Sequence, residues 1–389
     1  MEKSFLIPQD EIFMRISRLQ KEMETRAIDG ALIMQRVDLF YFTGTAQNGL
    51  LYVPVRGEPL LMVKRYYPRA RSESPLSRII EITSVREMPG LIMESYGGLP
   101  SIMGLEMDVI PVRELTFYKK LFPSLHMVNI SESILKIRAL KSDWEIRQLE
   151  QVAIRSKASF DFALECASAN KTEIELASQV QTHARSMGHG ARLRLRHHDE
   201  RAIPWNILVL SIPDMDTPSA PYPTNRALKP PCLVRLDFKW VYKGYHLDEV
   251  RMLALGKISE ELHRLWEALV EIHDHMVEQA LPGRPIQELY VSTRNKAKAL
   301  GYGDLFVGVT PQGCPRPDAP IGHCIGLELY EPPELRMGDR RILIPQMVLA
   351  LRPTFILDHR FPISIGTVLM ITETGNKLIS KIPIELFHK

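Results

Sequence analysis

Apolar positions in the first third of the chain alternate between a helical period and short buried runs. Residues 10–25 place Ile12, Ile16, Leu19 and Met23 on one face of a helix. Several other apolar runs follow, and we expect strands at 30–34, 39–44, 49–55, 58–63 and 104–108, with a second helix at 112–121. Helices that alternate with apolar strands predict a compact α/β domain ending near residue 132.

Long helices precede the strands in the rest of the chain. Two capping-box patterns, Ser142 with Glu145 and Thr172 with Glu175, predict the starts of helices that run to about residues 167 and 187. Two more helices are expected at 259–282 and 286–300. This order predicts an α+β domain, so we expect two domains, at residues 1–135 and 136–389.

A strongly apolar stretch at 232–256 contains two acidic residues. Its two halves read as strands joined at Lys243-Gly244, a turn signal. A two-residue turn at that point places residue 239 opposite Asp248 and Asp237 opposite residue 250, so the two aspartates are diagonal neighbours on one face. Two carboxylates on an apolar hairpin are unfavourable unless a cation lies between them.

Three arginines alternate with leucines at Arg192, Arg194 and Arg196. This spacing predicts a strand with three cations on one face. The face is interpreted either as solvated surface or as an anion-facing rim beside a pocket, and the sequence leaves both open.

Composition adds few constraints. The 389 residues are 45% apolar and carry a formal net charge of +3, which fits a soluble protein and gives no support to nucleic-acid binding. No apolar run is long enough to predict a signal peptide or a membrane span. The cysteines are scattered without a CxxC pair, so we expect free thiols in a reducing cytoplasm: Cys166, Cys232, Cys314 and Cys324.

Histidines occur in two different contexts. His263, His273 and His275 lie on one predicted helix without a carboxylate at ligand spacing, and we expect them on its solvent side. His323 instead lies between glycines in Gly322-His-Cys-Ile-Gly326, which predicts close backbone approach around a polar pocket. Two buried strands follow, the first ending at Arg352 and the second covering residues 363–375.

Taken together, these motifs resemble the pita-bread metallopeptidase family M24, which includes Xaa-Pro dipeptidase, aminopeptidase P, methionine aminopeptidase and creatinase. The resemblance covers nearly the whole chain. It implies a creatinase-type α/β N-terminal domain, whose strand-and-glycine signature would be residues 39–44, and an α+β pita-bread C-terminal domain. It also implies a homodimer.

The resemblance implies a site for two divalent metals held by two aspartates, one histidine and two glutamates. Asp237, Asp248 and His323 match three of these ligands. Arg352 and Gly366 stand where the two glutamates belong. The resemblance therefore implies a vestigial metal site.

Other positions of the expected cleft also depart from the family. Tyr330 replaces a family histidine and Cys324 replaces a family glycine, and the region around Trp205 lacks another family histidine. Arg251 is grouped with these residues as a cleft or ion-pair position. Cys324 is expected to be a buried, inert thiol, because neighbours on a strand point to opposite faces and it cannot form a dyad with His323.

A guanidinium cannot lose its proton, so Arg352 adds a permanent positive charge where cations should bind. Our hypothesis is that Arg352 pairs with Asp237, Asp248 or both, and that no cofactor is present. The alternative is one Mn, Zn or Co ion on Asp237, Asp248 and His323. On the motif alignment, Arg352→Glu combined with Gly366→Glu is predicted to create affinity for divalent metal.

These features predict a non-catalytic relative whose cleft binds a small peptide, another small molecule or a protein partner. The alternatives are an active Xaa-Pro dipeptidase-type metal hydrolase and a metal-free amidinohydrolase similar to creatinase, each with His323 as the candidate catalytic acid or base. Creatinase keeps the glutamate at the position of Arg352 and lacks the two aspartates. This chain instead keeps both aspartates and lacks that glutamate. No nucleic acid and no membrane are expected as partners.

Overall fold

The computed structural model describes residues 6–190, 193–196, 207–212, 223–309, 315–316, 318–357 and 361–389. The chain divides into two compact units, Met1–Arg138 and Ala139–Lys389. The division lies inside helix α6 (Ser131–Ala139), just after the boundary expected between residues 135 and 136.

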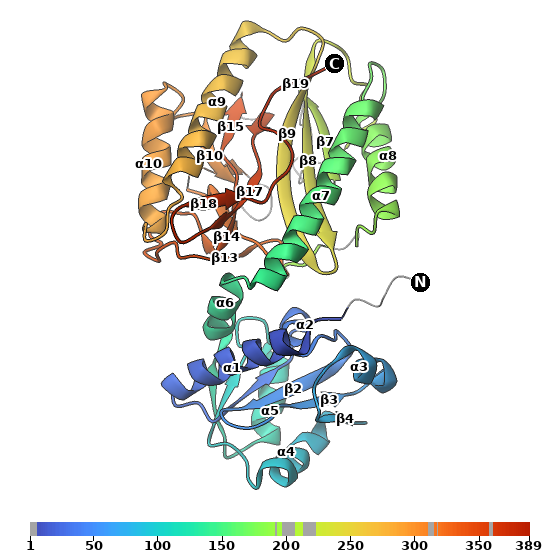
Figure 1. Ribbon diagram of the computed structural model, residues 1–389, viewed down its shortest axis with the longest axis vertical. Helices are drawn as coiled ribbons and strands as arrows, with labels where there is room; N and C mark the ends of the chain where they lie inside the picture. The colour runs from blue at the N-terminus through green and yellow to red at the C-terminus, as the bar shows by residue number, and fades with distance from the viewer. Residues whose placement is uncertain are drawn as a thin grey trace. The chain divides into compact units, whose positions relative to one another are not determined.

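The first unit is built on one mixed sheet with the strand order β4-β3-β2-β1-β5-β6. Its central strand β1 pairs antiparallel with β2 and parallel with β5. The strands are β1 (Gly30–Ile33), β2 (Gly49–Pro54), β3 (Leu60–Val63), β4 (Ile79–Glu81), β5 (Ile102–Leu105) and β6 (His126–Asn129). The helices are α1 (Gln9–Thr25), α2 (Arg36–Thr43), α3 (Tyr67–Glu73), α4 (Met88–Tyr96) and α5 (Val112–Leu121). Figure 1 shows these helices around the sheet.

The strand expected at 39–44 is wrong, because these residues belong to helix α2. The side chain of Gln35 accepts hydrogen bonds from the backbone of Val37 and Asp38 and starts the helix. Gly44 ends it in a left-handed conformation (φ 77°). Most of the helix is buried, and a short apolar run that is buried on all sides does not distinguish a helix from a strand.

Both predicted capping boxes are present in the second unit. Ser142 and Glu145 begin α7 (Asp143–Cys166), and Thr172 and Glu175 begin α8 (Glu173–Ser186). The other two helices are α9 (Glu260–Gln279) and α10 (Ile286–Ala299), close to their expected bounds. Figure 1 shows α9 beside α10.

The predicted hairpin is formed by β8 (Cys232–Tyr242) and β9 (Tyr245–Leu255). Its register pairs Lys239 with Asp248 and Asp237 with Val250, as expected. Lys243 and Gly244 both have positive φ, at 50° and 92°, the combination that a tight two-residue hairpin turn requires. Strands β7 (Ile207–Ile212) and β19 (Phe387–His388) flank the hairpin in one sheet.

Two further sheets complete the second unit. One has the order β13-β12-β14-β17-β18 and the other β11-β10-β15-β16. The first contains β12 (Gly322–Cys324), β13 (Glu331–Glu334), β14 (Val348–Leu351), β17 (Thr367–Ile371) and β18 (Asn376–Leu378). The second contains β10 (Phe306–Val309), β11 (Pro315–Arg316), β15 (Thr354–Leu357) and β16 (Phe361–Ser364). The single strand expected at 363–375 is therefore two strands in different sheets, separated at Ile365-Gly366.

Two further expectations differ from the structure. Residues 193–196 form no strand, so the proposed three-arginine face is not supported. His273 is 2% exposed rather than on the solvent side, and its Nδ1 lies 3.1 Å from Asp274 Oδ1. Arg192, Trp205 and Cys314 lie outside the described residues. Among the helices described, none has the length and apolar character needed to cross a membrane.

Candidate functional site

Strand β8 carries three charged side chains at every second position: Arg235, Asp237 and Lys239. They share one face because side chains alternate along a strand. All three are buried, and Asp248 of β9, directly opposite Lys239, is fully buried. The hairpin thus brings two carboxylates and two cations together in the interior of the second unit.

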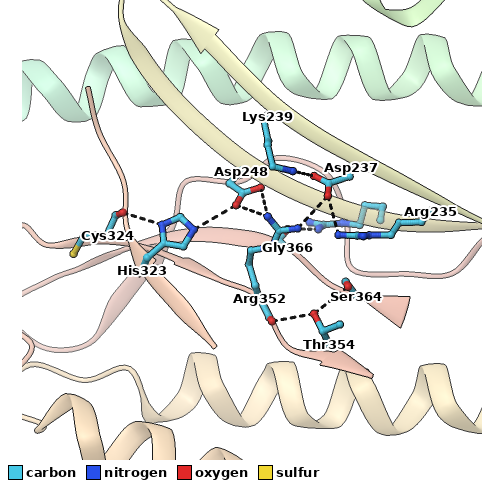
Figure 2. Close-up of polar contacts among 11 residues, drawn as sticks. Arg235, Asp237, Lys239, Asp248, His323, Cys324, Arg352, Thr354, Ser364 and Gly366 are labelled. Atoms are coloured by element: carbon cyan, nitrogen blue, oxygen red, sulfur yellow. Dashed lines mark hydrogen bonds and ion pairs between the residues drawn. The ribbon is translucent and has the colours of Figure 1, made fainter. Parts of the chain in front are cut away.

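Arg352 lies immediately after β14 and reaches both aspartates (Figure 2). Its Nη1 donates to both carboxylate oxygens of Asp248, at 2.9 and 2.7 Å, and its Nη2 donates to Asp237 Oδ2 at 3.1 Å. The backbone of Arg352 is held as well, because its N–H donates to Ile321 O and its carbonyl accepts from the hydroxyl of Thr354. The guanidinium is therefore fixed between the two carboxylates.

Asp237 is bonded by three different cations. Lys239 Nζ donates to its Oδ1 at 2.6 Å, and Arg235 Nη2 donates to its Oδ2 at 2.8 Å, beside the contact from Arg352. Figure 2 shows these side chains converging from β8 and from the segment after β14. Both oxygens of Asp237 are already occupied by charged donors.

His323 is the middle residue of β12, which pairs with β14. Its Nδ1 lies 2.9 Å from the carbonyl oxygen of Cys324, which can only accept, so Nδ1 is the donor. Its Nε2 faces Asp248 Oδ2 at 3.4 Å, and its ring lies 4.1 Å from the ring of Tyr330. The structure therefore brings His323, Tyr330 and Asp248 together.

The cations determine the ionisation of both aspartates. Burial alone raises a carboxyl pKa. At Asp248 this effect is outweighed by Arg352 and Lys239, and at Asp237 by Lys239, Arg352 and Arg235, so both pKa values lie below their usual range. In the same way the two aspartates raise the pKa of Arg352 despite its burial. Burial lowers the pKa of Lys239 and of Arg235, and the contact of each with Asp237 opposes that effect. The site consequently holds two ionised carboxylates in contact with three basic side chains.

Gly366 packs directly against strand β9. Its backbone bridges Val250, and a β-carbon at this position would lie 2.5 Å from Val250 N and 3.0 Å from the carbonyl carbon of Glu249. Such contacts are too short for any side chain. The pair of changes offered above, Arg352→Glu with Gly366→Glu, therefore does not recreate a metal ligand in this backbone.

Arg235, Asp237, Lys239, Asp248 and Arg352 form one buried charged cluster. Cys324 and Arg251 do not belong to this cluster. Cys324 points away from His323 into the hydrophobic core, and burial raises the pKa of its thiol to about 12. Arg251 follows Asp248 at an odd offset, so it occupies the opposite face of β9, where it donates to the backbone carbonyls of Gly366, Ile382 and Pro383. Its assignment to the cleft or ion-pair positions is wrong.

Arg235 and Lys239 were not predicted as site residues, because only the acidic residues of the hairpin were named as candidates. The signal was present, because residues two apart on a predicted strand share a face. Applied to Asp237, that rule places a cation on each side of it in sequence.

The residues present do not fit the two-metal site that the resemblance implies. Every oxygen of Asp237 and Asp248 accepts from a cationic donor, so a metal would have to displace fixed positive charges that repel it. Among the described residues, no group of three or more histidine, cysteine, aspartate or glutamate side chains is arranged to hold a metal ion.

Comparison with known families gives two matches. Residues 15–140 match the Creatinase/Prolidase N-terminal domain, and residues 147–373 match Metallopeptidase family M24. Among curated proteins, an uncharacterized peptidase, YqhT of Bacillus subtilis, is 27% identical over 375 residues, which cover 96% of this chain and 99% of that protein. The Xaa-Pro dipeptidase of Pyrococcus furiosus is 24% identical over 374 residues, with 96% and 99% covered.

Solved structures share the fold. An Xaa-Pro dipeptidase from Bacillus anthracis superposes with a TM-score of 0.83 at 23% identity, covering 97% of this chain and all of that one. The prolidase of Pyrococcus horikoshii gives 0.82 at 22% identity, with 96% and 100% covered. The expected architecture, a creatinase-type α/β domain followed by an α+β pita-bread domain, is confirmed.

Proposed function

We propose that this chain, which belongs to metallopeptidase family M24, is a ligand-binding protein without dinuclear-metal peptidase activity. The ligand class is a small peptide or another small molecule, and no resident metal is part of the proposal. We also expect a homodimer and a cytoplasmic location, but the proposal does not depend on either.

The contact of Arg352 with both aspartates carries the proposal. A two-metal hydrolase uses its cations to polarise the substrate and to generate hydroxide from bound water. Here the guanidinium neutralises the same carboxylates but offers only N–H donors and no position at which a water could be coordinated and activated. It supplies charge balance without the chemistry that a metal would provide.

The second candidate is an active Xaa-Pro dipeptidase-type hydrolase. Relatives that match almost the whole chain carry that name, and His323, which lies beside Asp248, is a group able to transfer a proton. A metal-free amidinohydrolase would rely on the same histidine.

Hydrolysis of Xaa-Pro dipeptides with added Mn²⁺ separates these readings. We expect no turnover above that of a protein-free blank, because every carboxylate oxygen of the two aspartates already accepts from a fixed cation that would repel a metal. His323→Ala should therefore leave the rate at the same background. His263→Ala, at a histidine whose side chain is 47% exposed, is the matched control.

Turnover by the wild-type protein that disappears in His323→Ala and persists in His263→Ala would reject the binding-protein proposal. Sensitivity of that turnover to a chelator would then assign it to a metal hydrolase, and insensitivity would assign it to the amidinohydrolase alternative.

A further inference from the structure

The charges of the buried cluster do not balance. Arg235, Lys239 and Arg352 contribute three positive charges, and the carboxylates that contact them, Asp237 and Asp248, contribute two negative charges. The surplus among these five side chains is one positive charge. An uncompensated charge at this depth destabilises the folded protein.

Hydrogen-bond donors are also left over in the same place. Arg235 Nε and Arg352 Nε are buried and have no hydrogen-bond partner. Their side chains are only 6% and 4% exposed, so bulk water does not supply the missing acceptors. Buried donors are paired in nearly all folded proteins. The cluster therefore lacks acceptors as well as negative charge.

Neighbouring acidic groups in the described part of the chain do not supply the missing charge. Glu249 lies on the opposite face of β9 and accepts from Ser156, and Glu331 is paired with Lys141 at 3.0 Å. Tyr330 stays a neutral phenol, because burial raises its pKa. Among described residues, the cations have no third carboxylate.

We propose that this cluster is the binding site for a carboxylate group of a small ligand, which supplies the third negative charge and accepts from the unpaired guanidinium N–H groups. Figure 2 shows the cations arranged on both sides of Asp237 and Asp248. The inference rests on the proposed binding function and specifies the chemistry of its ligand.

A carboxylate fits better than a phosphate for two reasons. Its single charge balances the surplus of one, whereas a phosphate dianion would leave the cluster negative. Its planar pair of oxygens also matches the fork of N–H groups that a guanidinium presents.

Thermal unfolding midpoints measured against acetate concentration at constant ionic strength test this site. We expect a saturable rise with acetate and none with acetamide, which has the same shape without the charge. Lys239→Met, which leaves two cations and two carboxylates, should weaken acetate binding at least tenfold. Lys257→Met, at an exposed lysine just beyond β9, should not change it.

Arg235→Met provides a second way to remove the surplus charge if Lys239→Met does not fold. Equal effects of acetate and acetamide, an acetate effect that survives in both cluster variants, or saturable binding of inorganic phosphate but not acetate would each overturn the carboxylate site. None of these outcomes depends on hydrolysis. The acetate titration can therefore reject the carboxylate site while the peptidase assay still supports a binding protein, and the two results are distinguishable.

Discussion

Replacing Arg352 with methionine is expected to lower the free energy of unfolding by about 3–5 kcal/mol, the usual effect of removing one partner from a buried ion pair. Methionine fills a comparable volume, so the loss reflects charge rather than a cavity. Urea denaturation of the two proteins measures it. An unchanged midpoint would mean that Arg352 is not held between the aspartates.

The loss should be concentrated at one of the two aspartates. Asp237 retains direct contacts with Lys239 and Arg235 when Arg352 is removed, whereas Asp248 retains the 3.4 Å approach of His323 and only the more distant charge of Lys239. Asp248→Asn in the Arg352→Met background should therefore recover most of the lost stability, and Asp237→Asn should not. Equal recovery by both changes would contradict the geometry.

The effect of Arg352→Met should also depend on pH. In the wild-type protein the folded-state pKa of Asp248 lies below its unfolded value, so its contribution is present above the unfolded pKa of about 3.9 and is lost only as the pH falls further. Without Arg352 the buried carboxyl is expected to have a raised pKa, which penalises the folded state as the pH rises. The stability difference between the two proteins should therefore grow from pH 4 to pH 7.

Adding a single methyl group at Gly366 is expected to destabilise the protein by about 1–3 kcal/mol or more, the range for overpacked interiors. The atoms it would meet are backbone atoms of β9, with Val250 N at 2.5 Å, so no flexible side chain can move aside. Gly375→Ala is the matched control, since a β-carbon there meets nothing within 4 Å. Comparable melting temperatures for the two variants would contradict the close packing of residues 365–367 on β9.

Much of the second unit could be predicted from local sequence signals. Lys243-Gly244 fixes the register of the hairpin because a two-residue turn allows one pairing, and this register in turn places Asp237 and Asp248 on the same face. The capping box at Ser142 fixes the start of α7 in a similar way. In both cases a few adjacent residues determine the backbone.

Features that depend on tertiary packing were predicted less well. Residues 36–43 are buried on most sides of their helix, so their apolar run shows no helical period in the sequence. His273 lies among polar residues in the sequence of α9, which predicts an exposed position, but its side chain is buried in the folded protein. The steric role of Gly366 arises only when residues far apart in sequence meet.

Equilibrium dialysis against Mn²⁺ or Co²⁺, followed by metal analysis of the protein, tests the central claim most directly. The claim is that the fixed cations around Asp237 and Asp248 occupy the position of the family's metals. It predicts no stoichiometric metal, with the wild-type protein and Asp248→Asn equally low. One or two tightly bound ions per chain in the wild-type protein, lost in Asp248→Asn, would contradict it.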